Sequence, residues 1–263
     1  MNKRLRYLLL PLLCALAAVS AVAGEDAALF VGPEYAAART RASSAYVLVD
    51  VRPAAEFAAV RIPGSLNIPL YAVATRTFLR GKTVILVNRG FCKSELIRSC
   101  RQLKTKGFSP RVLNGGLNAW IAAGLPVRGP SALRPEVDKV SPQEAYLETA
   151  GRSFLPVDVS TAARKEIFSH TRFIDPDQKT SLNDLKAYEK EHPLQAVLLF
   201  NREGTGYGQL RKQAAAAGMN RLFFLKGGRR AYQQYLDNLE RASAPRSKRM
   251  KVVNRIPCRS CND

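Results

Sequence analysis

The residues of this chain best suited to chemistry lie in one short segment, Asn88-Arg-Gly-Phe-Cys-Lys-Ser94. Its single thiol, Cys92, stands between the cationic side chains of Arg89 and Lys93. A neighbouring cation favours the thiolate, which is the nucleophilic form of cysteine. We therefore expect a lowered pKa at Cys92 and nucleophilic sulfur chemistry there. The alternative is a partly buried thiol at the start of a helix that takes part in no reaction.

This segment belongs to a pattern that occurs twice. A strand ending in Val-Asp-Val, a strand running into Asn-Arg and a Gly-Gly turn follow one another in the same order. Because internal repeats decide the architecture before any single motif does, we predict two copies of one domain of ordinary size. The matching landmarks are Asp50 and Asp158, Asn88 and Asn201, and Gly115 and Gly227.

Four apolar runs rich in β-branched residues predict strands, and each is too continuous for a sheet with one exposed face. Helical stretches follow two of them and end before Gly107 and Gly218, where a helix-terminating glycine is expected. Alternating strands and helices indicate an α/β fold with parallel sheets. The predicted strands cover residues 45–51, 83–87, 154–159 and 196–200, and the predicted helices cover residues 95–106 and 209–217.

Taken together, the motifs of the first copy resemble a rhodanese domain. They are Asp50-Val-Arg52, Arg61-Ile-Pro-Gly-Ser-Leu-Asn-Ile-Pro-Leu70 and Gly115-Gly-Leu-Asn-Ala-Trp120, within residues 30–128. Residues 140–240 resemble the same domain in a degraded form. The resemblance implies two tandem rhodanese-like domains, each a parallel sheet flanked by helices. It also implies transfer of sulfane sulfur through a cysteine persulfide, which loop N–H groups at a helix N-terminus stabilise.

One departure from this family governs the functional prediction. The residue that closes the strand is the catalytic cysteine in the family, whereas this chain has Asn88 in the first copy and Asn201 in the second. A carboxamide cannot carry sulfur. The resemblance therefore leaves Cys92, flanked by Arg89 and Lys93, as the candidate persulfide site, and the second copy as chemically silent.

The spacing of the two copies suggests how Cys92 would fit. Asn88 lies 19 residues before Gly107, whereas Asn201 lies 17 residues before Gly218. We therefore expect the first loop to be two residues longer than the second. A cysteine within an enlarged loop would still lie near the ring of N–H groups.

Few other residues could support a reaction. We interpret Asp50, Arg52 and Asp158 as structural, because the resemblance implies that such residues order the loops. The chain has only two histidines, His170 and His192, so neither a Cys–His dyad nor a histidine metal site is expected. We predict no metal and no cofactor.

The ends of the chain predict export. Residues 1–23 have a basic start, an apolar run and a final Ala-Val-Ala, the order found in secretory signal peptides. A periplasmic or secreted protein without a stable membrane span after cleavage is expected, and an uncleaved N-terminal anchor is the alternative. The remaining segments are a first domain (27–128), a Pro-containing linker (129–139), a second domain (140–240) and a basic tail (241–263).

The tail carries a second set of thiols, Cys258-Arg-Ser-Cys261. In an oxidising compartment such a pair favours a small-ring disulfide, and Arg255 and Arg259 would favour thiol exchange. Two ligands are too few for a closed zinc site, so a structural metal is not expected. The alternative is a ragged chain end with no role.

The charge of the chain indicates what it could bind. The formal charge is +20, of which the signal peptide supplies three and the tail a net six, so the two-domain body carries +11. Such a body favours anionic partners, among them small sulfur-containing anions and an acidic protein. No nucleic-acid-reading motif accompanies the charge, so nucleic acid is not an expected partner. A high isoelectric point is also ordinary for some exported proteins.

Three functions remain open from the sequence. The first is a persulfide carrier or thiosulfate-type sulfurtransferase that uses Cys92 and exchanges sulfur with a small anion or a partner-protein thiol. The second is a catalytically inactive rhodanese-fold binding or scaffold protein. The third is thiol redox or metal handling through Cys258 and Cys261.

Overall fold

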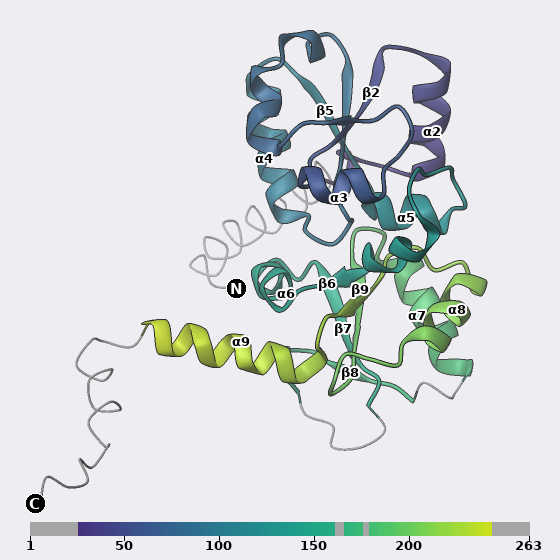
Figure 1. Cartoon of the computed structure of the whole chain (residues 1–263), viewed down its shortest axis with the longest axis vertical. Helices are drawn as coiled ribbons and strands as arrows, with labels where there is room; N and C mark the ends of the chain where they lie inside the picture. Colours follow the sequence, from purple (N-terminus) through teal and green to yellow (C-terminus); the bar gives the residue numbers. More distant parts are fainter. Residues whose placement is uncertain (1–25, 161–165, 176–178, 244–263) are drawn as a thin grey trace, which may run out of the picture.

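The computed structural model describes residues 26–160, 166–175 and 179–243. The predicted signal peptide and the tail with Cys258 and Cys261 lie outside these residues. The described chain folds around two five-stranded sheets, and the first domain lies above the second in Figure 1. The strand orders are β1-β5-β4-β2-β3 and β6-β10-β9-β7-β8, with parallel pairing between neighbours.

The second sheet repeats the order of the first, strand for strand. The predicted α/β fold with two parallel sheets flanked by helices is therefore confirmed. The first domain contains β1 (Phe30–Val31), α2 (Pro33–Ala42), β2 (Tyr46–Asp50), α3 (Ala54–Ala59), β3 (Leu66–Asn67), η1 (Leu70–Thr75), η2 (Thr77–Leu79), β4 (Thr83–Val87), α4 (Ser94–Thr105), β5 (Ser109–Leu113) and α5 (Gly116–Ala122). The second contains β6 (Lys139–Val140), α6 (Pro142–Thr149), β7 (Phe154–Asp158), β8 (Arg172–Phe173), α7 (Lys179–Glu191), β9 (Ala196–Phe200), α8 (Gly208–Ala216), β10 (Leu222–Leu225) and α9 (Gly228–Ser243).

The central strands are buried on both faces, as their continuous apolar runs predict. In β4, Val84 and Leu86 pack on the face covered by α4, whereas Ile85 and Val87 pack on the face that holds Trp120 of α5. The strand β9 divides its side chains between two cores in the same way. This double coverage fixes where β4 and β9 end, and so where the loops that follow them begin.

One prediction about the connections is wrong. The first loop is not longer than the second, because α4 begins six residues after Asn88 and α8 begins seven residues after Asn201. The two extra residues of the first copy instead fall within the helical part, since α4 has 12 residues and α8 has nine. The segment expected as the linker, residues 129–139, contains a 3-10 helix, η3 (Ser131–Glu136), and β6 begins at Lys139.

In each domain, the loop after the central strand touches the Gly-Gly turn through backbone alone. A Cβ added to Gly90 would lie 2.0 Å from the carbonyl oxygen of Gly115, and one added to Gly116 would lie 2.4 Å from the nitrogen of Gly90. In the second domain, a Cβ on Gly204 would lie 2.2 Å from the nitrogen of Gly228. The repeated Gly-Gly motif therefore keeps the loop close to the start of the following helix.

Replacement of Gly90 by alanine should be far more destabilising than replacement of Gly124. Both glycines have a positive φ, which costs an alanine roughly 1–2 kcal/mol, but a Cβ on Gly124 would meet open space. Gly90→Ala should therefore lower the free energy of unfolding by clearly more than Gly124→Ala, as measured by chemical denaturation. Equal losses would show that the close backbone approach at Gly90 does not exist in solution.

Candidate functional site

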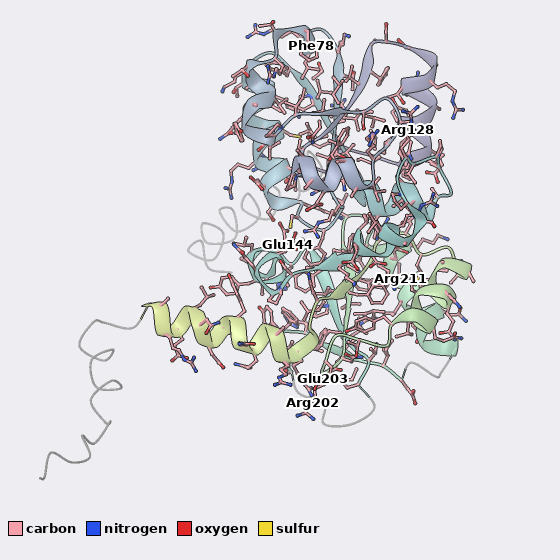
Figure 2. All side chains as sticks on the ribbon, viewed as in Figure 1. Phe78, Arg128, Glu144, Arg202, Glu203 and Arg211 are labelled. Atoms are coloured by element: carbon pink, nitrogen blue, oxygen red, sulfur yellow. The ribbon has the colours of Figure 1, made fainter. Side chains whose placement is uncertain are left out.

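The candidate site lies at the carboxyl end of β4, where the first loop (residues 88–94) reaches the second domain. A cleft of ≈ 760 Å³ opens there between the two domains, and Asn88, Arg89 and Cys92 line it together with Glu144 of α6. Glu144 marks this boundary between the domains in Figure 2. The structure thus brings together three of the residues that the sequence singled out.

Asn88 closes the first loop on itself. Its Oδ1 accepts a hydrogen bond from the backbone N–H of Gly90 at 2.8 Å, and its Nδ2 donates to the carbonyl oxygen of Cys92 at 2.6 Å. The loop therefore turns a carbonyl toward the side chain at the strand end. A carbonyl dipole in that position repels an anion, whereas a ring of N–H groups would attract one.

The second copy builds the same bridge. The Oδ1 of Asn201 accepts from the N–H of Gly204 at 2.7 Å, and its Nδ2 donates to the carbonyl of Thr205 at 2.7 Å. The hydroxyl of Tyr207 accepts from the backbone N–H of Asn201 at 3.0 Å. In both domains a neutral asparagine at the strand end thus bridges the loop, since it accepts from one loop N–H and donates to one loop carbonyl. We call this bridge the asparagine clip.

Cys92 is a poor nucleophile in this setting. Burial raises the pKa of its thiol to about 12, and the negative charges of Glu144 and Glu148 add to that effect. Arg89 lowers the pKa of Cys92, but its effect is smaller than these. The expectation of a lowered pKa is therefore wrong, because the second domain covers the thiol and brings two carboxylates close to it.

The two cations beside Cys92 in the sequence point into the second domain. Arg89 forms an ion pair with Glu144 and donates from Nη1 to the carbonyl of Lys139 at 3.1 Å. Lys93 is 4% exposed, and its Nζ donates to the carbonyl of Leu194 at 2.6 Å. Burial, followed by the charge of Arg221, lowers the pKa of Lys93 to about 7.

Phe91 anchors the loop in the core of the second domain. Its ring centroid lies 5.1 Å from that of Phe154 and 5.4 Å from that of Phe223, within the cluster beneath α6 and α9. Ser94 adds a polar contact, since its Oγ donates to Glu148 at 2.9 Å. The loop that the sequence singled out for sulfur chemistry is therefore part of the domain interface.

Among the described residues, the second loop (residues 201–207) forms no hydrogen bond or ion pair with the first domain. Its residues Arg202 and Glu203 lie at the end of the second domain that faces away from the first (Figure 2). Both are more than half exposed and pair with one another at 3.5 Å. Residues 201–207 contain neither a phenylalanine nor a lysine, so the second loop lacks the side chains with which Phe91 and Lys93 dock the first loop.

The strand-end aspartates are buried and paired in both copies. Asp50 accepts from the Nη2 of Arg52 at 2.6 Å, and the same nitrogen donates to the carbonyl of Val60. Asp158 instead pairs with Arg229 of α9 at 3.3 Å. Sequence reasoning missed Arg229, although the second copy has Ser160 where the first has Arg52 and carries two arginines after its Gly-Gly turn.

The remaining candidates do not assemble into a site. No group of three or more His, Cys, Asp or Glu residues that could hold a metal ion occurs in residues 26–160, 166–175 and 179–243. Cys100 is buried in the first core, where burial raises its pKa to about 11. The ring of His192 packs on Tyr188. Within the same residues, no helix has both the length and the apolar character needed to cross a membrane.

Comparison with known proteins places the first domain in a family. Residues 33–123 match the rhodanese-like domain family. A sulfurtransferase of Allochromatium vinosum is 34% identical over 88 residues, which make up 32% of this chain and 79% of that protein. The chain belongs to the rhodanese-like family.

Two further proteins match different shares of the chain. The HTH-type transcriptional regulator Rv0324 of Mycobacterium tuberculosis is 35% identical over 91 residues, and the match spans 34% of this chain and only 40% of the regulator. The crystal structure of a thiosulfate sulfurtransferase from Pseudomonas aeruginosa matches 77% of this chain and 43% of that chain, with 15% identity and a TM-score of 0.33.

The pH profile of alkylation should reveal the raised pKa of Cys92. Only the thiolate reacts, so the rate of Cys92 modification by iodoacetamide should increase about tenfold per pH unit from pH 7 to 9.5 without levelling. Mass-spectrometric mapping of the peptide that contains Cys92 separates it from the other thiols. A plateau below pH 9 would mean that the thiol ionises in the ordinary way.

The pH dependence of the free energy of unfolding should reveal the buried amine of Lys93. The unfolded chain keeps this proton up to about pH 10.5, whereas the folded chain releases it near pH 7. Between these values the unfolded state binds more protons, so stability from this group rises with pH by up to about 1.4 kcal/mol per unit.

We therefore expect wild type to gain stability relative to Lys93→Met as the pH increases from 7 to 10. Urea denaturation of both proteins at each pH provides the measurement, and shared titrations cancel in the difference. Below pH 7 the two curves should run parallel. A constant difference from pH 6 to 10 would contradict the burial of a neutral Lys93.

Proposed function

We propose that this protein is a catalytically inactive, exported member of the rhodanese-like family that acts as a binding protein. The observation that carries this proposal is the asparagine clip. In both domains the strand-end side chain is a neutral amide that holds a loop carbonyl, at Cys92 in one copy and Thr205 in the other. Neither loop offers a nucleophile at the strand end or an arrangement that attracts an anion there.

Electrostatics opposes a negative charge on sulfur in this loop. A persulfide or thiolate needs several N–H groups directed at the sulfur to stabilise its charge. At Asn88, one loop N–H is already used by Oδ1, and the neighbouring carbonyl is directed inward. Two carboxylates, Glu144 and Glu148, further raise the cost of a negative charge on Cys92.

A persulfide carrier that uses Cys92 is the second candidate, and one observation favours it. Cys92 lines the cleft between the domains, so a small sulfur-containing anion or a partner thiol could approach it there. Such a carrier would have to overcome the pKa of about 12. The thiol pair Cys258 and Cys261, outside the described residues, is a further separate hypothesis from the sequence.

Export follows from the N-terminal sequence. A signal peptide over residues 1–23 would deliver the mature chain to the periplasm or the exterior, where a basic body would meet acidic proteins and small anions. In this proposal the two rhodanese folds serve as a rigid support for binding, without a cofactor or a metal.

Intact-mass analysis after exposure to thiosulfate or polysulfide tests the absence of sulfur transfer. We expect no gain of about 32 Da, the mass of one sulfur atom, at Cys92, because its thiol stays protonated near neutral pH. Cys92→Ser is the matched control, since it removes the loop thiol and leaves those of the tail. Sulfur that maps to Cys92 in wild type and disappears in Cys92→Ser would overturn the proposal in favour of the carrier.

A further inference from the structure

We infer that the cleft between the domains binds an extended segment of a partner protein through an apolar anchor flanked by one acidic and one basic residue. This inference rests on the proposed function, because it names what a binding protein of this kind would hold. It stands on the side chains that line the cleft, on their exposure and on the charges left unpaired there.

The first observation is apolar exposure. Tyr71 is 85% exposed and Leu147 is 62% exposed, which makes them the two most exposed large hydrophobic side chains of the described residues. Both line the same cleft, Tyr71 from the first domain and Leu147 from the second. Exposed apolar side chains that gather at a cavity indicate a surface that another protein covers.

The second observation is the pairing of charges inside the cleft. Three acids that line it each have a lining cation within 4 Å, in the pairs Arg89–Glu56, Arg89–Glu144 and Lys139–Glu136, whereas Arg52 is held mainly by the buried Asp50 at 2.6 Å. Most of the charge that lines the cleft is therefore already paired. An apolar anchor between Tyr71 and Leu147 would not meet the excess of positive charge that the body as a whole carries.

Two lining charges remain, one on each domain. Glu95 of α4 and Lys226, just after β10, form no ion pair within 4 Å with any residue that the structure describes. Charge complementarity then sets the chemistry and the direction of the occupant. Its acidic residue would lie toward Lys226, and its basic residue would lie toward Glu95.

The walls of this cleft are fixed before a partner arrives. Phe91, whose ring packs in the second domain, also lines the cleft, and so does Arg89 with its partner Glu144. The contacts of Phe91 and of the Arg89–Glu144 pair, which bring the loop with Cys92 against the second domain, therefore also hold the two walls together. A preformed site loses little conformational entropy on binding, and a volume of ≈ 760 Å³ lies within the range of protein ligand sites.

The test selects phage-displayed random peptides of about a dozen residues on the full chain. We expect sequences in which an apolar residue is flanked by an acidic and a basic residue. A synthetic peptide of the selected sequence should then bind in fluorescence anisotropy. Tyr71→Ser and Leu147→Ser should each weaken this binding by about tenfold or more, the scale of an interface anchor.

Phe78→Ser provides a matched control. Phe78 is also an exposed large hydrophobic residue, at 54%, but it lies at the far end of the first domain, away from Glu144 and the cleft (Figure 2). Binding should be unchanged in this variant. Equal losses in Phe78→Ser and Tyr71→Ser would mean that the peptides recognise exposed apolar groups in general, and would overturn the inference.

Charge reversal tests the direction of the bound segment. Lys226→Glu should weaken binding of the selected peptide. A peptide whose acidic residue is changed to lysine should bind that variant as the selected peptide binds wild type. A selected peptide that binds Lys226→Glu as tightly as it binds wild type would contradict the charge assignment. Concentration-dependent self-association of the wild type that Tyr71→Ser abolishes would show that a second copy of the chain occupies the cleft, which also overturns the inference. None of these outcomes depends on sulfur loading at Cys92, so the proposed function stands or fails separately.

Discussion

The insertion of Phe91 into the core of the second domain is the contact on which the rest of the site depends. A buried phenylalanine contributes about 1.5–3 kcal/mol relative to an exposed one, and this ring lies between Phe154 and Phe223. Because Phe91 belongs to the loop after β4, the loop is not free to open toward solvent. The interface therefore fixes where the loop lies. The bridge from Asn88 to the carbonyl of Cys92 is a property of the loop itself, since the second loop forms the same bridge at Asn201 without docking.

The charges around the loop follow from the same contact. Once the second domain covers the loop, Lys93 is buried beside a backbone carbonyl and Arg89 pairs with Glu144. Glu144 and Glu148 then face Cys92 and oppose its ionisation. A single docking event thus changes a cysteine flanked by cations in the sequence into a protonated thiol flanked by carboxylates in space. The second loop, which docks on nothing comparable, keeps the same clip but exposes its charges.

The sequence predicted the fold well where local pattern decides the structure. β4 and β9 run over residues 83–87 and 196–200 as predicted, because strands buried on both faces show continuous apolar runs. The glycines at 107 and 218 adopt positive φ after α4 and α8, where helix-terminating glycines were expected. These features depend on a few neighbouring residues, so a single sequence contains them.

The site could be predicted only in part, because its properties depend on contacts far apart in the chain. Cys92 does lie near Arg89, but no pattern near residue 92 indicates Glu148, which is 56 residues away in the sequence. The direction of Lys93 likewise depends on Leu194, in the other domain. Sequence spacing also misplaced the extra residues of the first copy, since it cannot distinguish a longer loop from a longer helix.

Hydrogen–deuterium exchange of the two loops tests the central claim most directly, because the second loop serves as an internal standard. If the first loop is an interdomain contact, amides of residues 88–94 should exchange much more slowly than those of residues 201–207, and Phe91→Ala should remove most of that difference. Equally fast exchange in both loops of the wild-type protein would contradict the claim, since it would mean that the first loop is as open to solvent as the second.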